Sequence, residues 1–440
     1  MVTMRIDTLK IENFKLFAEQ TIALHEQFNL LVGENGAGKT TILDALAVAA
    51  GIWLVNPPDT ILRNSGRNIL PAEIRVEPES RGDRIQFIQK RPVVIAADGT
   101  IGREPVTWVR QIRADGQRTT NLDAKEALGM VARIYQRDQS GEKLVCPVLA
   151  YYGAGRAWIS SNERIPKEVR TNGEARRWAA FYDCFNERIR PAELREWFLR
   201  ETTAAGNRGG KMRAGFEIVR RAILRCVPDA DAVWFDADRK EIVLSIAGRA
   251  MPFNNLSAGQ RMMLALVADL AIKAVTQNAF LVPADESGPS DGPLPRVLAE
   301  TPGLVLIDEL DVHLHPRWQR RVASDLKETF PSIQFVCTTH SPQMIGELPP
   351  AEIRLLKNGE VIVPDHSYGV DSNRVLEELM GAKSRNHDVE EALRRLAEAV
   401  DQENFIEAKK LITELASAIG NDDPEVTRAN TLLKFLESTL

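Results

Sequence analysis

The sequence predicts an α/β fold built around a nucleotide-binding lobe, and three observations favour this class. A buried strand over residues 27–32 leads into a glycine-rich segment of the form G-x-x-x-x-G-K-T and then into a helix over 41–50. Two more apolar strands, 303–307 and 333–337, each end in polar residues. Residues 381–440 have the pattern of three amphipathic helices. We therefore expect a mixed sheet, an antiparallel β subdomain, an inserted helical region and a C-terminal helical module.

The composition is that of a soluble globular protein with two or three domains. The 440 residues are 44% hydrophobic and 27% charged. A formal net charge of −5 argues against a wholly basic nucleic-acid coat but permits a local basic face. No apolar run approaches the roughly 20 residues of a membrane helix, and charged residues interrupt the N-terminal segment. The four scattered cysteines suit a reducing compartment. We expect a cytoplasmic protein without membrane contact.

The glycine-rich segment is a candidate phosphate-binding loop. Its glycines let successive backbone N–H groups turn towards a polyphosphate, and the following helix adds partial positive charge. Lys39 can reach the terminal phosphates, and the Thr40 hydroxyl can hold a bridging Mg²⁺ ion. An ordinary glycine turn is the alternative, but the flanking strand and helix favour a nucleotide. The residues predicted to bind it are Gly33, Asn35, Gly36, Gly38, Lys39, Thr40 and Thr41.

The N-terminal third adds strands around this loop. Two opening strands are expected over 3–12 and 21–24, and antiparallel hairpins over 57–116, with turn signals at Asp98-Gly99 and Asp115-Gly116. A helix over 123–137 and a buried strand over 144–151 follow. The strand ends in Tyr-Tyr-Gly-Ala-Gly-Arg, which either presents Arg156 and backbone amides to a ligand or forms only a turn.

Residues 156–225 are helical in pattern and basic. They contain sixteen Lys and Arg against nine Asp and Glu. A basic helical insertion can contact phosphate backbones of DNA. It can equally be a solvated face whose arginines pair with neighbouring acids. The sequence leaves both interpretations open.

Three later segments carry chemistry that fits the glycine loop. Asp308 follows an apolar strand and is a candidate Mg²⁺ partner, acting through water. Glu309 is the candidate general base that polarises an attacking water. His340, at the end of another strand, is placed to hydrogen-bond the γ-phosphate. The third segment, Leu-Ser-Ala-Gly-Gln over 256–260, precedes a long apolar helix.

In this order, the four segments resemble those of ABC-type ATPases, within them the SMC/RecF-like branch. Residues 256–260 resemble the L-S-G-G-Q signature, with Ala258 in place of one glycine. The resemblance implies that Ser257 and Gly259, with Gln260 beside them, serve the nucleotide held by an opposite subunit, and that Asp311 lies at the D-loop position. It therefore implies ATP and Mg²⁺ as cofactors and a dimer or higher homo-oligomer with composite ATP sites.

Two roles differ from the family pattern or compete with it. In this family a segment called the Q-loop senses the γ-phosphate. No glutamine stands at that position here, and only Arg156 or a residue near Tyr152 is available. The γ-phosphate-sensing role is therefore left open. His313-x-His315-Pro316 can be interpreted as a metal-binding pair. It more closely resembles the segment that opens the helix after the catalytic glutamate in this branch, which is the interpretation we favour.

A narrower resemblance extends over essentially the whole chain. Leu149 to Arg156, the segment from Val370, and Asp422-Asp-Pro-Glu are similar to the PtuA-type ATPases of Septu anti-phage systems. In that family the ATPase works with a separate HNH nuclease. The expected function is thus an ATP-hydrolysing subunit of a defence complex, which uses ATP-dependent self-association to control a partner HNH nuclease. We do not expect this chain to be a nuclease by itself.

Two other functions compete with this one. A stand-alone RecF-like DNA-repair ATPase would bind DNA through residues 156–225. A transporter ATPase is disfavoured by the long separation between the glycine loop and residue 257.

The expected domain organisation is an N-terminal ATPase lobe over 1–155, a basic helical insertion over 156–250, a C-terminal ATPase lobe over 251–380 and a docking module over 381–440.

Overall fold

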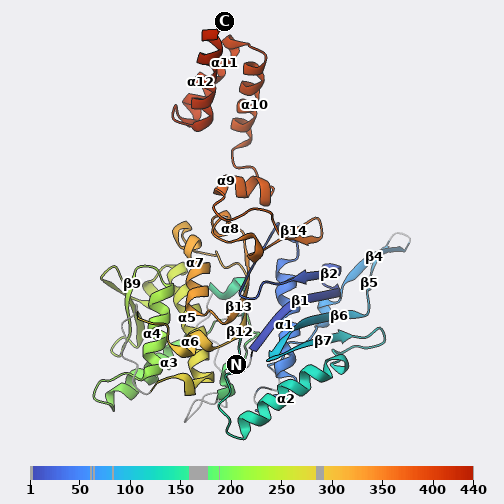
Figure 1. Ribbon diagram of the computed structural model, residues 1–440, viewed down its shortest axis with the longest axis vertical. Coiled ribbons are helices and arrows are strands. Elements are labelled where there is room, and N and C mark those ends of the chain that lie inside the picture. The colour runs from blue at the N-terminus through green and yellow to red at the C-terminus, as the bar shows by residue number, and fades with distance from the viewer. Residues whose placement is uncertain are drawn as a thin grey trace. The chain divides into compact units, whose positions relative to one another are not determined.

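The computed structural model describes residues 3–59, 62, 65–81, 84–157, 177–187, 189–283 and 292–439 (Figure 1). The chain forms two compact units, Met1–Val370 and Asp371–Leu440. The helical module predicted over 381–440 lies within the second unit. Residues 158–176, the first part of the predicted basic insertion, lie outside the described residues.

The first unit is organised around a six-stranded sheet of order β15-β14-β3-β13-β12-β8. Only β15 runs antiparallel to its neighbour. Strands β8, β12 and β13 are buried along their whole length, as is typical of parallel strands inside an α/β sheet. The strands are β3 (Phe28–Gly33), β8 (Val148–Tyr152), β12 (Gly303–Ile307), β13 (Ile333–Thr339), β14 (Ile353–Lys357) and β15 (Glu360–Ile362).

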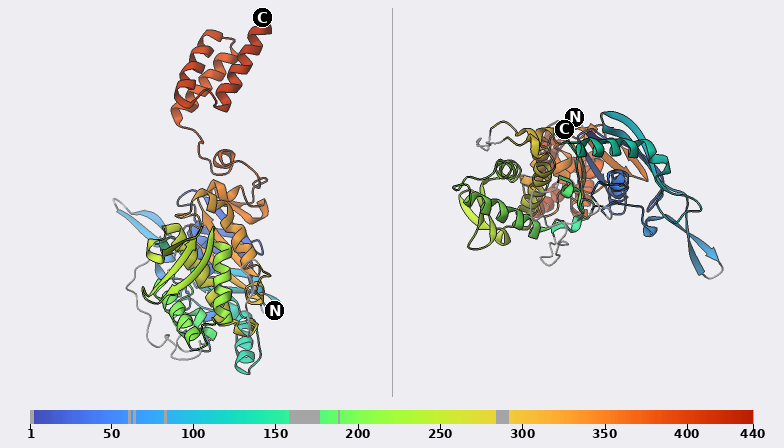
Figure 2. Two further views of the ribbon diagram at one scale, coloured as in Figure 1. Left: turned by 90° about the vertical axis from the view of Figure 1, so that its left-hand side faces the viewer. Right: turned by 90° about the horizontal axis from the view of Figure 1, so that it is seen from below.

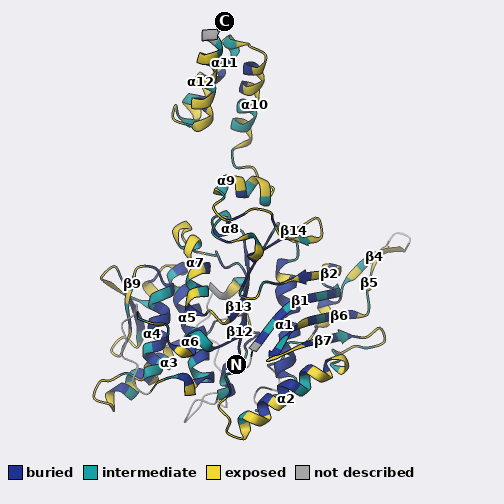
Figure 3. Cartoon of the chain, in the orientation of Figure 1, coloured by how far each residue is buried: buried dark blue, intermediate teal, exposed yellow. Residues whose placement is uncertain are grey.

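A second, antiparallel sheet has the order β2-β1-β6-β7. Helix α1 (Lys39–Ala50) contacts strands of both sheets, and all of its residues except Thr40 are buried. In Figure 3 the buried residues gather in α1 and the central sheet. The helix is apolar on nearly every face because it has a sheet on two sides. The strands are β1 (Thr3–Phe14), β2 (Phe17–Ala23), β6 (Val93–Gly102) and β7 (Glu104–Ile112).

The prediction of a turn at Asp98-Gly99 is wrong. Strand β6 continues through both residues, and the chain reverses after Gly102, whose φ is +76°. Gly99 instead allows close packing, because a Cβ atom there would lie 2.0 Å from the carbonyl oxygen of Arg5 on β1. The β1–β6 register also shifts at this point, between Ile6 and Thr8. A tertiary contact therefore explains a glycine that the sequence presented as a turn residue.

Another expected hairpin is confirmed as β4 (Val76–Arg81) with β5 (Arg84–Gln89). Figure 2 shows it extending away from the four-stranded sheet. The helix expected over 123–137 is α2 (Lys125–Gln139).

The remaining part of the first unit is largely helical. Helix α4 (Ala214–Cys226) packs against α5 (Ala258–Gln277), and α5 in turn contacts β8. A three-stranded sheet of order β11-β10-β9 lies beside α3 (Pro191–Gly206). The other elements are β9 (Ala230–Asp236), β10 (Glu241–Ile246), β11 (Arg249–Pro252), α6 (Arg296–Glu300), α7 (Pro316–Thr329) and α8 (Pro342–Ile345).

The second unit contains the three expected amphipathic helices. They are α10 (His387–Asp401), α11 (Phe405–Ile419) and α12 (Pro424–Thr439), preceded by the short α9 (Ser372–Arg374). Their apolar faces form a core of their own, with Leu396, Leu411 and Val426 among its buried residues. Throughout the described part of the chain, no helix has the length and apolar character needed to cross a membrane.

Candidate functional site

The glycine loop joins the end of β3 to the start of α1. Gly36 and Gly38 have φ angles of +82° and +100°, which side-chain-bearing residues rarely adopt. A Cβ atom at Gly38 would also lie 2.5 Å from the Phe17 ring, so the opening hairpin fixes this residue type as well. The loop conformation thus depends on glycine at the positions of the phosphate-binding pattern.

The helix after the loop starts at Lys39, two residues earlier than predicted. Among the described residues, no side chain caps this helix start. Its first N–H groups are therefore available to an external acceptor, and the helix dipole favours an anion there.

Lys39 lies at the mouth of the loop with only 7% of its surface exposed. Its Nζ donates hydrogen bonds to the carbonyl oxygens of Gly33 (2.7 Å) and Glu34 (3.0 Å). Burial lowers the pKa of Lys39, while the charges of Asp308, Glu309 and Asp311 act in the opposite direction. All three acids therefore lie within electrostatic reach of the lysine.

Asp308 connects the end of β12 to the glycine loop. Its Oδ2 accepts a hydrogen bond from the Thr40 hydroxyl (3.0 Å), and its Oδ1 accepts one from the Thr338 hydroxyl (2.6 Å). Only 8% of Asp308 is exposed. Hydroxyl and carboxylate oxygens are ligands that Mg²⁺ prefers, so this pair fits the ion that the sequence predicted. Thr338 was not foreseen, although a Thr-Thr-His run at a strand end is a visible signal.

Glu309 follows Asp308 in a left-handed backbone conformation, with a φ of +50°. Its N–H donates to the Thr338 hydroxyl at 2.7 Å, which holds this unusual turn in place. The residue is half-buried, whereas Asp308 is buried. Two adjacent carboxylates therefore have different surroundings, as different roles at one site would require.

Asp311 and His340 are joined through the end of β13. The Asp311 carboxylate accepts hydrogen bonds from the Thr339 hydroxyl (2.7 Å) and the His340 backbone N–H (3.3 Å). Strand β13 lies between β3 and β12. The glycine loop, Asp308, Glu309, Asp311 and His340 thus meet at the carboxyl edge of neighbouring parallel strands, where ligands bind in open α/β sheets.

The predicted signature forms the start of α5. The Ser257 hydroxyl accepts from the Gln260 N–H (3.2 Å), and the Gln260 side chain accepts from the Ser257 N–H (2.9 Å), a reciprocal cap. Ser257 is exposed. Gly259 is buried, and a Cβ atom there would lie 2.4 Å from the carbonyl oxygen of His313. Within one chain, then, the signature packs against the loop that follows Glu309.

Other predicted features have simpler local roles or remain open. His315 caps the start of α7, its Nδ1 accepting from the Arg317 N–H at 3.3 Å. Among the described residues, no three His, Cys, Asp or Glu side chains lie together in a group that could hold a metal ion. Tyr152 donates to Asp269 (2.5 Å), while the buried Tyr151 hydroxyl has no hydrogen-bond partner in the described part of the chain. The Arg156 side chain lies outside the described set, so the Q-loop role remains open.

An ion-pair network that the sequence did not predict includes a buried carboxylate of α1. Lys15, in the turn between β1 and β2, pairs with the buried Asp44 of α1. Arg67 lies 3.5 Å from Asp44 and also pairs with Glu73. These residues are far apart in sequence and form no motif. Only the folded chain brings them together.

Comparisons with known proteins point to one group of ATPases. A family model described as an AAA domain matches residues 8–196. Another, described as "AAA domain, putative AbiEii toxin, Type IV TA system", matches residues 242–346. The Septu protein PtuA of Bacillus thuringiensis is 22% identical over 91% of this chain and 90% of its own length. The chain is thus similar to AAA-type ATPases and, over most of its length, to PtuA.

Two further similarities cover different shares of the chain. The retron Ec83 probable ATPase of Escherichia coli is 35% identical over 42% of this chain. That match covers 31% of the retron protein, so this chain spans less than a third of it. A solved SMC head bound to the C-terminal winged-helix domain of ScpA aligns over 83% of this chain and 98% of its own. The identity is 16% and the TM-score 0.44. The sheet order and the glycine-loop geometry by themselves define the α/β fold of the first unit.

Proposed function

We propose that this chain is the ATPase subunit of an anti-phage defence complex. It binds and hydrolyses ATP with Mg²⁺, and ATP-dependent self-association controls a partner HNH nuclease. The observation that carries the proposal is the 3.0 Å hydrogen bond between Thr40 and Asp308. This contact joins the phosphate loop to the strand-end carboxylate that an Mg²⁺–nucleotide site needs.

Each residue has a defined part in the proposed reaction. The loop N–H groups and Lys39 bind the phosphates, while Thr40 and Asp308 hold the Mg²⁺, which neutralises phosphate charge when bound. Glu309 accepts a proton from the attacking water as general base, and its half-buried setting leaves it accessible to water. His340 hydrogen-bonds the γ-phosphate. Its backbone is held by Asp311, which fixes the histidine relative to β12.

Self-association is the second part of the proposal. Ser257 is exposed at the start of a twenty-residue helix, where backbone N–H groups and the helix dipole favour an anion. The γ-phosphate bound by another copy is such an anion. The resemblance to ABC-type ATPases supports this arrangement, with ATP holding two heads together and hydrolysis releasing them.

The defence role and the nuclease partner rest on the relatives. Proteins named Septu PtuA and retron probable ATPase align with this chain, which supports the defence role. The HNH nuclease partner is proposed from the resemblance to PtuA-type ATPases alone. Among the described arginines of the basic insertion, several pair with acids, namely Arg177, Arg190, Arg213 and Arg220. This pairing favours a structural use of those arginines over the competing RecF-like function, in which they would bind DNA.

Glu309→Gln tests the proposal directly. The variant is expected to bind ATP, to hydrolyse it at least about 100-fold more slowly because the base is lost, and to accumulate as an ATP-bound oligomer in light scattering after size exclusion. Lys39→Ala is the matched control that should neither bind ATP nor associate. If Glu309→Gln hydrolysed ATP at the unaltered rate, Glu309 would not be the general base.

A partner HNH protein should co-purify with the unaltered chain. Failure to co-purify would contradict only the proposal of a nuclease partner.

A further inference from the structure

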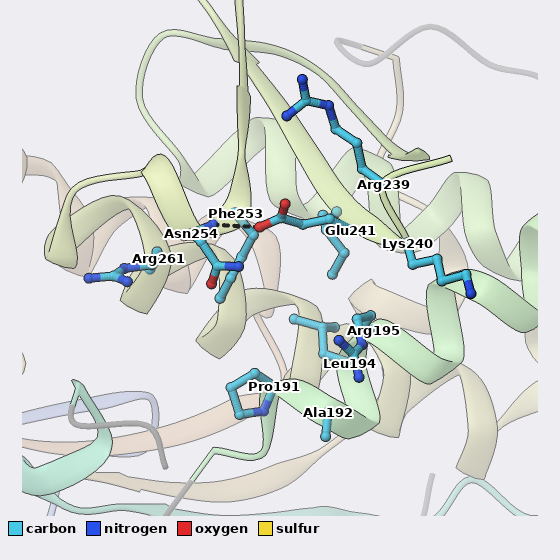
Figure 4. Close-up of a pocket in the computed structure, with 11 residues that line it drawn as sticks. Pro191, Ala192, Leu194, Arg195, Arg239, Lys240, Glu241, Phe253, Asn254 and Arg261 are labelled. Carbon is cyan, nitrogen blue, oxygen red and sulfur yellow. Dashed lines mark hydrogen bonds between the residues drawn. The ribbon is translucent and has the colours of Figure 1, made fainter. Parts of the chain in front are cut away.

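A cavity of about 280 Å³ lies in the first unit outside the glycine-loop site (Figure 4). It is formed by the start of α3, the turn between β9 and β10, and the segment that leads into α5. Four cations line it: Arg195, Arg239, Lys240 and Arg261. They come from three separate parts of the chain, and Figure 4 shows Arg261 on one side of the lining and Arg195, Arg239 and Lys240 on the other.

The charge of this cavity is unbalanced. In the part of the chain that the structure describes, none of the four cations has an ion-pair partner. The single acidic residue in the lining is Glu241, whose Oε1 accepts a hydrogen bond from the Asn254 N–H at 2.8 Å. Four positive charges against one negative charge make the cavity attractive to anions.

The interior of the cavity differs from its rim. Leu194 and Ile242 are 5% and 3% exposed and provide an apolar wall, and the half-buried Phe253 adds an aromatic ring. Asn254 brings an amide that both donates and accepts hydrogen bonds. An apolar wall with a few polar groups is typical of small-molecule sites, which usually measure about 300–1,000 Å³.

We propose that this cavity binds a nucleoside phosphate. The cations bind the phosphate, the base lies against Phe253 and the aliphatic wall, and Asn254 and Glu241 meet the polar edge of the base. The volume is too small for a duplex or a folded protein segment. A free nucleotide and the unpaired end of a nucleic-acid strand offer the same chemistry, and the test below separates these two sources.

The position of the cavity also links it to assembly, a step that rests on the proposed function. Phe253 and Asn254 belong to the turn that immediately precedes Ser257, and Arg261 lies in the first turn of α5. A ligand that contacts all three fixes the start of the helix that carries the signature. The bound nucleotide therefore regulates how readily the signature engages another copy.

The binding test uses the full chain with Lys39→Ala, which removes nucleotide binding at the glycine loop. Adenosine monophosphate and a short single-stranded oligodeoxyadenylate are titrated by calorimetry. We expect binding of at least one probe, weakened at least about tenfold by the Arg195→Ala/Arg261→Ala pair, because bonds to charged groups are lost. Phe253→Ala should also weaken it. Arg249→Ala, a nearby cation outside the lining, is the matched control and should bind like the parent.

The outcomes separate the alternatives. Binding of the monophosphate identifies a free nucleotide as the ligand source, and binding of the oligonucleotide alone identifies a strand end. Absence of binding by both, or unchanged binding in the Arg195/Arg261 variant with an unchanged melting temperature, overturns the site. Pyrophosphate competing as well as the monophosphate, with no effect of Phe253→Ala, overturns the nucleotide assignment. Because the glycine loop is inactivated throughout, these results stand whether or not ATP drives association.

Discussion

Among single residues, Asp308 makes the decisive contact of the candidate site. Its two carboxylate oxygens accept hydrogen bonds from Thr40 on the phosphate loop and Thr338 on β13. Two segments more than 250 residues apart thereby meet at one side chain. Sequence alone pointed to the acid because it follows an apolar strand. The contact of the Thr338 hydroxyl with Asp308 depends on β12 and β13 being neighbours in the sheet, a pairing that no local pattern records.

Replacing Asp308 with Asn tests its role as a metal partner. The amide removes the negative charge but keeps the shape, so the Mg²⁺-dependent part of ATP affinity should fall about tenfold or more. Nucleotide affinity measured in excess chelator should stay near the parent value. Titration of a fluorescent ATP analogue with and without Mg²⁺ measures both. If the affinity for nucleotide fell equally with and without Mg²⁺, the substitution would have damaged the glycine loop, and Asp308 would not be a metal partner.

Gly259→Ala tests the contact between the signature and the loop after Glu309. The new Cβ would lie 2.4 Å from the His313 carbonyl oxygen, which is backbone and cannot rotate away. We expect a loss of about 1–3 kcal/mol in the free energy of unfolding, measured by chemical denaturation. Gly206→Ala is the control, since no described atom lies within 4 Å of a Cβ there. Equal stability of the two variants would contradict the close packing.

At the scale of elements, the start of α5 has two roles: it caps the helix, and in the proposed function it contacts the nucleotide bound by another copy. Ser257 caps the helix together with Gln260 while remaining exposed. To cap the helix, residue 257 needs only a side-chain oxygen that accepts a hydrogen bond. To contact the γ-phosphate bound by another copy, it must also carry no negative charge. Substitutions can separate the two, because they have different chemical requirements.

Ser257→Asp keeps a good helix cap but places a negative charge where the proposal needs an anion to bind. Its melting temperature should match that of the parent, and ATP-driven oligomers should be lost in light scattering. Ser257→Ala loses the cap as well, at a cost of about 0.5–2 kcal/mol of stability. ATP-driven association by Ser257→Asp equal to that of the parent would exclude a phosphate contact at this residue.

The sequence predicted the elements that local patterns determine. The strand, loop and helix at 27–50, the hairpins and the three C-terminal helices all have a period or a turn signal of their own. It failed at Asp98-Gly99, where the glycine serves an approach to Arg5 on another strand. It also missed the pairing of Lys15 with Asp44, because no local pattern records a contact between distant segments.

For the candidate site, the same distinction holds. The glycine loop, Asp308 and Glu309 carry motifs and were expected together, and the sheet order brings them to one edge. The cavity between α3, β10 and α5 had no signal, since its cations come from three segments without a shared spacing. Charges that gather only after folding are invisible in a single sequence.

For the whole molecule, the main division is between Met1–Val370 and Asp371–Leu440. All the residues of the candidate site lie in the first unit, and the second has its own apolar core around Leu411. A chain that ends at Val370 should therefore fold and bind ATP with an affinity within about threefold of the full chain. Calorimetric titration measures this. A loss of binding with retained folding would show that the second unit contributes to the site.

The close contact between Gly259 and His313 has a consequence for assembly. It means that the start of α5 and the segment from Asp311 to His315 form one preorganised surface in each chain before any encounter. Conformational entropy that is lost on folding does not have to be lost again on binding, so affinity is gained without new contacts. A peptide that copies residues 256–260 alone lacks this rigidity and should be a poor competitor of self-association.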